Sequence, residues 1–285
     1  MNTFFDMDCG GETVTLEKTD NGDIIFHGWD EETEMAAIEM GFEPSLCFAV
    51  WNAINDDALD QKLLSQAKRG DVSLIEALIF VGASVDAKNK VRRTPLYYAA
   101  ARGYEDIAMV LIDAGAPINE HDYYGQTPLH TTAQHGCAAV AKVIISAGAI
   151  VDAKDTLKRT PLHAAAVYGY ADVVKILLAS GASIDTKDHQ GWTPLYAAAW
   201  WGNTVVAKIL LTAGSSVNAE ANGLLTPLHA AARNDNADIA KLLLEAGASV
   251  DARTEKGTTP LGLASAWDRY NVVKVINAWI EEHGS

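Results

Sequence analysis

The apolar positions after residue 160 follow a helical period that begins at a clear start signal. Thr160 precedes Pro161, which is typical of a helix start, because threonine caps the first turn and proline needs no amide donor there. Leucine and alanine at residues 162–166 give one narrow apolar face that allows close packing. Gly169 is expected to end this short helix in a left-handed conformation.

A second, longer helix is predicted directly after Gly169. Its apolar residues are concentrated at 173–178, and it is expected to stop at Gly181. An extended run at residues 183–185 then leads into a projecting finger before the next helix start. Neither helix can bury its apolar face alone, so the pair must stack on similar pairs.

This pattern recurs every 33 residues without an insertion. The tripeptide Thr-Pro-Leu begins at Thr94, Thr127, Thr160, Thr193, Thr226 and Thr259. One step before Thr94 the tripeptide is degraded to Gln-Lys-Leu at 61–63, although the downstream pattern persists at 78–87. The sequence therefore predicts seven units within residues 58–285.

Two motifs carry a family resemblance. They are Thr-Pro-Leu-His-x-Ala-Ala, as at 160–166, and Leu-Leu-x-x-Gly-Ala-x-Val-Asp-Ala, as at 243–252. Residues 58–285 resemble an ankyrin-repeat domain. The resemblance implies a mainly α solenoid of helix–turn–helix units with β-hairpin fingers, in which the first and last units act as caps. It also implies that His130, His163 and His229, in the fourth position of the first motif, make structural hydrogen bonds.

The fingers differ in the residue two places before Thr-Pro-Leu. Glycine stands there as Gly125, Gly191 and Gly257, whereas the alternate units carry Arg92, Lys158 and Leu224. Because glycine alone adopts positive φ freely, the second set of fingers is expected to turn differently or to be strained.

Residues 1–57 do not fit the repeat. Alternation at 13–16 and 24–26, around turn residues at 19–23, predicts a β-hairpin. Helices are predicted from Asp30 to Gly41 and, after Pro44, over 46–54. We therefore expect a small α+β unit at 1–57 that packs against the first repeat, because a unit of this size is marginal alone.

Charge separates these two regions. The chain has 22 basic and 37 acidic residues, a net charge of −15, and residues 1–57 hold 14 of the acids with one base. Four bases cluster in the first finger, at Lys88, Lys90, Arg92 and Arg93. The acidic unit could be a solubilising cap, a docking surface for a basic partner, or a lid over this basic cluster. Nucleic acid is not expected as a partner, because phosphate binding needs a basic surface.

Candidate chemistry is sparse. Cys137 follows His135, but neighbouring residues at a helix end do not face each other well, and no phosphate loop, zinc helix or nucleophile elbow occurs. Packed units lie about 8–10 Å apart, so histidines one repeat apart cannot share a metal ion. We expect no catalytic site, no cofactor, no metal and no enzyme activity.

The expected location is cytoplasmic. Three scattered cysteines do not form a disulfide framework, and the first twelve residues lack a signal-peptide core. An uncharged passage at 189–207 approaches the length of a membrane span, but it contains Gly191, Pro194 and Gly202. We expect no membrane segment, and a monomer.

The positive signal is aromatic. The resemblance places the finger residues before Thr-Pro-Leu, and the two residues after Ala-Ala, on the concave face. Large aromatic residues at such free positions are typical of interface hot spots. The predicted function is non-catalytic binding of a protein partner. The acidic charge of the chain suits a basic partner. The candidate binding residues are Tyr123, Tyr124, Gln126, His135, Leu157, Arg159, Tyr168, His189, Gln190, Trp192, Trp200, Trp201, Leu225, Arg233 and Trp267.

Two alternatives remain open at this point. The acidic unit at 1–57 suits an inhibitor or immunity-type protein that neutralises a basic toxin or nuclease, because complementary charge speeds association. The second alternative is an enzyme with its site inside residues 1–57. The one histidine in that segment, His27, can equally be an ordinary strand residue.

Overall fold

The structure is a computed structural model that describes residues 3–8, 13–20, 24–27 and 58–284. The chain divides into two compact units, Met1–Glu120 and His121–Ser285, which are described separately below. The helices predicted at 30–41 and 46–54 lie outside the described residues.

The first unit contains an antiparallel sheet with strand order β1 (Thr3–Asp8), β2 (Thr13–Lys18), β3 (Ile24–His27). The predicted hairpin is confirmed as β2 and β3, whereas β1 was not expected from the sequence. Phe5 stacks on Phe80 with ring centroids 5.4 Å apart, and Leu16 is fully buried. The sheet therefore packs on the first repeat, as predicted.

Two repeats complete the first unit. They are α3 (Leu59–Arg69) with α4 (Val72–Val81), and α5 (Pro95–Arg102) with α6 (Glu105–Asp113). The first helices of the two pairs, α3 and α5, contact each other, as do the second helices, α4 and α6. The first, degraded repeat thus keeps the helix pair of the others.

Five more helix pairs form the second unit. In order they are α7 (Pro128–His135), α8 (Ala138–Ser146), α9 (Pro161–Tyr168), α10 (Ala171–Ala179), α11 (Pro194–Trp201), α12 (Thr204–Thr212), α13 (Pro227–Arg233), α14 (Ala237–Glu245), α15 (Pro260–Ala266) and α16 (Tyr270–His283). With the two pairs of the first unit, they confirm the seven repeats predicted from the sequence.

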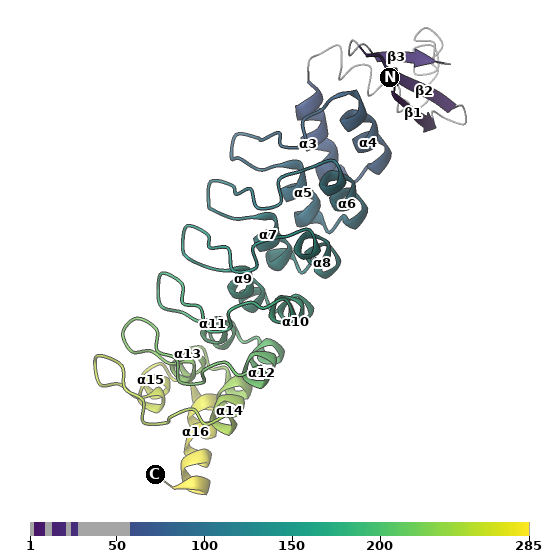
Figure 1. The fold of residues 1–285 in the computed structure, drawn as a ribbon. Coiled ribbons are helices and arrows are strands. Elements are labelled where there is room, and N and C mark those ends of the chain that lie inside the picture. Colours follow the sequence, from purple (N-terminus) through teal and green to yellow (C-terminus); the bar gives the residue numbers. More distant parts are fainter. Residues whose placement is uncertain (1–2, 9–12, 21–23, 28–57, 285) are drawn as a thin grey trace, which may run out of the picture. The chain divides into compact units, whose positions relative to one another are not determined.

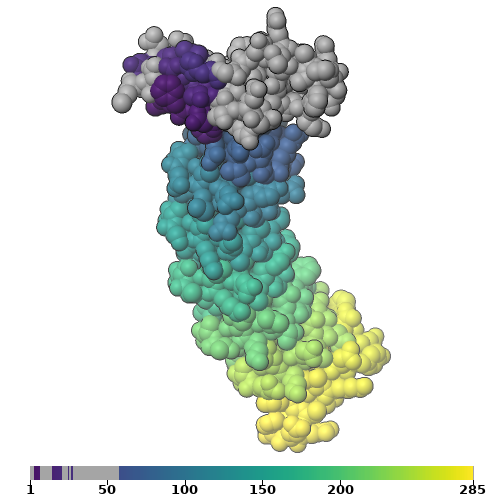
Figure 2. Space-filling view, turned by 90° about the vertical axis from the view of Figure 1, so that its right-hand side faces the viewer, coloured from purple at the N-terminus to yellow at the C-terminus, as the bar shows by residue number. Residues whose placement is uncertain are grey.

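The second unit has two helical layers. The odd-numbered, short helices contact one another in series, and so do the even-numbered, long helices from α8 to α16. The fingers project beside the short helices (Figure 1). In the space-filling view the repeats of this unit follow each other as consecutive bands ending in yellow (Figure 2). Leucine, valine and alanine between the layers are buried, and Leu162, Val174 and Leu177 are fully so.

Helix ends form as the sequence predicts. The hydroxyl of Thr193 accepts a hydrogen bond from the backbone N–H of Tyr196 at 3.2 Å, and Pro194 occupies the first helical position. At the other end of a short helix, Gly169 adopts the left-handed conformation with φ 80°. The Thr-Pro start recurs in repeats two to seven, and a left-handed glycine ends the first helix of repeats one to five.

The fingers all turn in the same way. Arg92, Lys158 and Leu224 have φ of 63°, 59° and 58°, in the left-handed region that Gly125 and Gly191 occupy at 74°. The fingers without glycine therefore have the same turn as the others and differ in backbone strain. The strain arises because a side chain crowds the following carbonyl at this φ.

Each finger has the connectivity of a hairpin but consists of turns. In repeat four the N–H of Asp155 donates to the carbonyl of Arg159 at 2.9 Å, and the N–H of Lys158 donates back to Asp155 at 2.8 Å. Residues 184 and 185, expected to be extended, form a turn, and no finger residue in the described ranges belongs to a strand.

Among the described residues, no helix combines the length and the apolar character that crossing a membrane requires.

Candidate functional site

The repeated histidines have a structural role. In repeat four the ring of His163 lies at the start of α9, where its Nδ1 accepts a hydrogen bond from the N–H of Thr160 at 3.2 Å. Its Nε2 lies 2.9 Å from the backbone carbonyl of Trp192 in the next repeat, and therefore carries the proton and donates it. His130 and His229 make the equivalent bonds to Arg159 and Thr258. This confirms the hydrogen-bonding role that the resemblance implied.

Burial keeps these rings neutral. Desolvation lowers the pKa of His130, His163 and His229, although each hydrogen bond to a carbonyl acts in the opposite direction. Both nitrogens of each ring are occupied, so none is free to transfer a proton to a substrate. The lowered pKa therefore reflects packing between repeats and not a catalytic site.

Cys137 has none of the features of an activated nucleophile. The half-buried thiol donates to the carbonyl of His135 at 3.8 Å, and burial raises its pKa. The imidazole of His135 is itself hydrogen-bonded to the carbonyl of Thr131 at 2.9 Å. In the part of the chain that the structure describes, no three His, Cys, Asp or Glu residues are placed to hold a metal ion.

Backbone hydrogen bonds join successive fingers of the second unit. The N–H of Thr156 donates to Tyr124, that of His189 to Leu157, and that of Asn222 to Gln190, each at 3.0 Å. A fourth bond runs from Glu255 to Gly223 at 3.0 Å. Because the bonded positions recur every 33 residues, the finger tips form a continuous row with fixed spacing.

An aspartate holds most finger tips rigid. Oδ1 of Asp188 accepts from the N–H groups of Gln190 and Trp192 at 2.8 and 2.9 Å. Asp122 and Asp155 make the same pair of bonds in their own fingers. The sixth repeat has Ala221 at this position, so its finger tip lacks a side-chain acceptor there.

The centre of the predicted surface is a packed group that we term the Trp–Arg cluster, consisting of Trp192, Tyr196, Trp200, Arg233 and Trp267. The ring centroid of Trp192 lies 4.8 Å from that of Tyr196 and 5.1 Å from that of Trp200. Trp192 and Trp200 are half-buried, and Tyr196 is buried. Burial also raises the pKa of Tyr196 to about 12. These three rings therefore form a preorganised platform within repeat five.

Arg233 links this platform to the last two repeats. Its guanidinium carbon lies 5.2 Å from the ring centroid of Trp200 and 5.2 Å from that of Trp267. The amide of Asn236 also donates to the carbonyls of Ala199 and Trp200, at 2.8 and 3.3 Å. Arg233 thus lies between two indoles, and the backbone beneath one of them is fixed by the next repeat.

Other predicted aromatic residues are exposed. The exposed fractions of Tyr123, Tyr124, Tyr168 and Trp201 are 65%, 59%, 57% and 59%. Trp201 directly follows the half-buried Trp200, and consecutive helical residues point about 100° apart. Of this adjacent pair, Trp200 therefore belongs to the platform and Trp201 faces solvent.

Some of the remaining predicted residues make polar contacts, and the others are exposed or half-buried. Arg159 forms an ion pair with buried Asp155 through Nε and a terminal nitrogen, both at 2.8 Å. His189 Nδ1 lies 3.2 Å from the carbonyl of Leu157. Leu157, His135, His189 and Gln190 are exposed, Gln126 and Leu225 are half-buried, and Leu224 is more exposed than Leu225.

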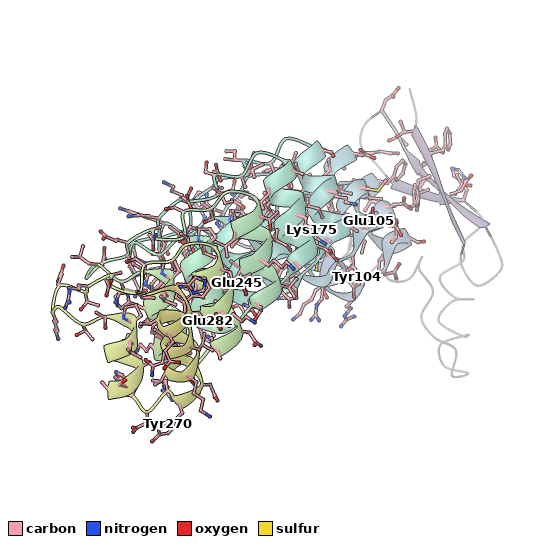
Figure 3. The ribbon with its side chains drawn as sticks, turned by 90° about the horizontal axis from the view of Figure 1, so that it is seen from below. Tyr104, Glu105, Lys175, Glu245, Tyr270 and Glu282 are labelled. Carbon is pink, nitrogen blue, oxygen red and sulfur yellow. The ribbon has the colours of Figure 1, made fainter. Side chains whose placement is uncertain are left out.

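Several aromatic residues with packed or exposed rings were not among the candidates from the sequence. Tyr196 is one of them, and its ring completes the aromatic platform. Tyr170 stacks on Tyr168 at 6.4 Å, and Tyr270 is 68% exposed at the start of α16, where Figure 3 shows it pointing outward. The signal was present for Tyr196, because it precedes Trp200 by one helical turn.

The basic cluster of the first finger is partly neutralised. Lys88 and Arg92 both form ion pairs with Glu120, at 3.0 and 3.2 Å. Arg93 lies over the ring of Tyr97, 4.7 Å from its centroid. The strongest basic segment of the sequence is thus tied to its own unit by a carboxylate and an aromatic ring.

The comparisons with known proteins agree with this geometry. A family model described as ankyrin repeats (3 copies) matches residues 63–155, 145–221 and 218–279. The chain belongs to the ankyrin-repeat family. Ankyrin repeats are generally protein–protein interaction modules and are typically non-catalytic.

A solved ankyrin-repeat structure is also similar. The crystal structure of the human ASB11 ankyrin repeat domain is 31% identical, with a TM-score of 0.70. The similarity covers 78% of this chain and 98% of that domain. No match was found among the curated proteins.

Proposed function

We propose that this ankyrin-repeat protein is a non-catalytic module that binds a protein partner on the short-helix and finger surface of His121–Ser285. The surface is centred on the Trp–Arg cluster and extends to Tyr124, Tyr168 and Trp201. The observation that carries this proposal is the row of exposed aromatic side chains beside a rigid aromatic platform. A contiguous apolar patch on a protein surface is typical of a partner site.

The geometry supports binding more than catalysis. The repeated histidines are buried and hydrogen-bonded, and the thiol of Cys137 has a raised pKa. The side chains of Tyr124, Tyr168 and Trp201, in contrast, are largely exposed. Hot spots of protein interfaces are enriched in Trp, Tyr and Arg, the residue types that meet here. We place this activity in the cytoplasm, in keeping with three scattered cysteines.

The test is affinity capture with three forms of the full-length protein. Wild type, Trp201→Ala and Met109→Ala are immobilised and exposed to a lysate of the source cells, and bound proteins are quantified by mass spectrometry. Trp201 and Met109 are both exposed, at 59% and 47%, but Met109 lies on the long helix α6. A partner of the proposed surface is retained by wild type and Met109→Ala and lost from Trp201→Ala. Equal retention by all three forms contradicts the proposal.

The alternative that acts through the acidic residues 1–57 predicts a different response. Binding through those charges would weaken steeply between low and high salt, because screening acts on exposed charges. Binding through the aromatic surface would survive high salt and depend on Trp201. Measuring the captured partner at both salt concentrations therefore separates the two surfaces.

A further inference from the structure

The most unusual charge on the proposed surface is that of Arg233. Its guanidinium carbon lies 5.2 Å from both the Trp200 and the Trp267 ring centroids, and the residue is exposed. Within the described ranges, no carboxylate lies close enough to form an ion pair with it. Stacking against aromatic faces leaves the N–H groups at the rim of a guanidinium available to an acceptor. Arg233 is therefore a charged, preorganised donor without a carboxylate of its own among these residues.

The short-helix layer around Arg233 contains no acidic residue. Helices α7, α9, α11, α13 and α15 contain no Asp or Glu, and Arg233 is the one formal charge in them. The long-helix layer differs, because Lys175, Glu245 and Glu282 project outward from it (Figure 3). The short helices that carry the exposed Tyr168 and Trp201 are thus neutral to positive, whereas the whole chain has a net charge of −15.

Nearby carboxylates are engaged elsewhere or lie outside this layer. Asp188 accepts from two backbone N–H groups of its own finger. Asp235 accepts from the amide of Asn271 at 2.7 Å and from the N–H of Val272 at 3.1 Å. Asp268 lies in the turn after α15, at φ 55°, and forms no ion pair with Arg233. The guanidinium is therefore not satisfied by these neighbouring acids.

We infer that the Trp–Arg cluster binds a partner segment in which an Asp or Glu side chain is adjacent to an apolar residue. The carboxylate accepts hydrogen bonds from the Arg233 guanidinium, and the apolar neighbour packs on Trp192 and the exposed Trp201. A cationic segment does not fit, because Arg233 already occupies the space between the two indoles and would repel it. This inference rests on the proposed function and specifies the chemistry of the partner.

The binding probe is a phage-displayed library of random twelve-residue peptides, selected on the immobilised full-length protein. Displayed peptides are joined to the coat protein at their C-terminus, so a selected carboxylate is a side chain. We expect the selected peptides to share an Asp or Glu beside an aromatic or aliphatic residue. Enrichment of Lys or Arg instead, or no acidic preference, would overturn the inference.

The selected peptide is then resynthesised with a fluorophore and its Kd is measured by anisotropy. Arg233→Gln should weaken binding about 10- to 100-fold, as expected for losing charge-assisted hydrogen bonds. Replacing the peptide's acid by its amide should weaken binding to wild type equally and leave binding to Arg233→Gln unchanged. Lys208→Gln is the matched control, because it removes one positive charge from an exposed site on the long helix α12.

The variants also separate this inference from the proposed function. Peptides that lose affinity with Trp201→Ala but bind Arg233→Gln normally would overturn the acidic-segment inference and leave the binding surface intact. Peptides whose Kd is unchanged by both substitutions would contradict the proposed function as well. Far-UV circular dichroism of each variant confirms the fold, which is expected to persist because Arg233 and Trp201 are exposed.

Discussion

The imidazole of His163 donates a hydrogen bond from Nε2 to the backbone carbonyl of Trp192, 2.9 Å away in the next repeat. The structural histidine of repeat four therefore fixes the finger end that carries the first ring of the Trp–Arg cluster. Its other nitrogen accepts from the N–H of Thr160, so the ring makes both bonds at once only in its neutral form. This coupling makes the geometry of the proposed surface sensitive to the protonation of a buried residue.

Stability should fall as the solution becomes acidic. Burial holds the pKa of His130, His163 and His229 below the ordinary value of about 6.5, so the unfolded chain binds protons first. The stabilisation that these three neutral rings give to the folded state is complete above about pH 6.5. It is lost as the pH falls through the lowered folded-state pKa. Urea unfolding followed by circular dichroism at pH 8, 6.5 and 5.5 measures this slope.

The control for this pH dependence is His121→Gln, because His121 is exposed. It should leave the slope unchanged, whereas His163→Gln should flatten it. Equal slopes for wild type and His163→Gln would show that these buried rings do not control acid sensitivity.

The strained fingers should be stabilised by glycine. Lys158 and Leu224 have φ of 59° and 58°, where a side chain costs about 1–2 kcal/mol. Lys158→Gly and Leu224→Gly should each raise the free energy of unfolding by about 0.5–1 kcal/mol, because part of the gain is offset by the flexibility of glycine when unfolded. A shift of the urea midpoint to higher concentration is the expected result, and a lower midpoint would contradict it.

The glycines at the same finger position should differ among themselves. A Cβ on Gly191 would lie 2.9 Å from the backbone nitrogen of Asn222, whereas nothing lies within 4 Å of a Cβ on Gly257. Both have φ near 75°, so the conformational cost is shared. Gly257→Ala should lower the free energy of unfolding by about 1 kcal/mol. Gly191→Ala should lower it by more, because the neighbouring finger at Asn222 must move to make room for the methyl group. Equal urea midpoints would show that finger contact has no energetic role.

The adjacent tryptophans should respond in opposite ways to substitution. Trp200→Ala removes a half-buried ring from contacts with Trp192 and Tyr196, and should cost about 2–3 kcal/mol of folding stability. Trp201→Ala should change stability by less than about 0.5 kcal/mol, because the side chain is largely exposed. Partner binding should show the greater specific loss for Trp201→Ala, by about 2 kcal/mol or more. Urea unfolding and anisotropy on the same samples measure both effects.

Asn236 should stabilise the C-terminal end of α11, the short helix of the preceding repeat. Its amide donates to the carbonyls of Ala199 and Trp200, and Asn236→Ala should cost about 1–2 kcal/mol. Asn236→Asp should cost more at neutral pH, because a carboxylate cannot donate and repels both carbonyls. Asn277→Ala on the exposed side of α16 is the control and should leave the urea midpoint nearly unchanged. Equal effects of Asn236→Ala and the control would contradict this role.

Much of the repeat scaffold could be predicted because its signals are local. Thr193 and Pro194 start a helix, and Gly202 ends it, through backbone preferences that act within a few residues. The 33-residue spacing then requires every unit to adopt the same register. The role of the histidines followed from the family resemblance alone, since their carbonyl partners lie 29 residues away.

The first 57 residues show where such reasoning ends. The β2–β3 hairpin was predicted from strand alternation around a turn, but β1 was not, although Asp8 pairs with Thr13 across a connection as short as that between β2 and β3. The contact between Phe5 and Phe80 joins residues that no short pattern relates.

The sequence by itself determined the repeat number and the start and stop signals of most helices. The tertiary structure alone decided which candidate surface positions hold exposed rings, because that depends on side chains supplied by neighbouring repeats. Trp200 and Trp201 are adjacent and identical in type, yet Arg233 of the next repeat covers one of them and leaves the other in solvent. A periodic sequence specifies where each repeat begins and ends, whereas contacts across repeats determine what its surface presents to a partner.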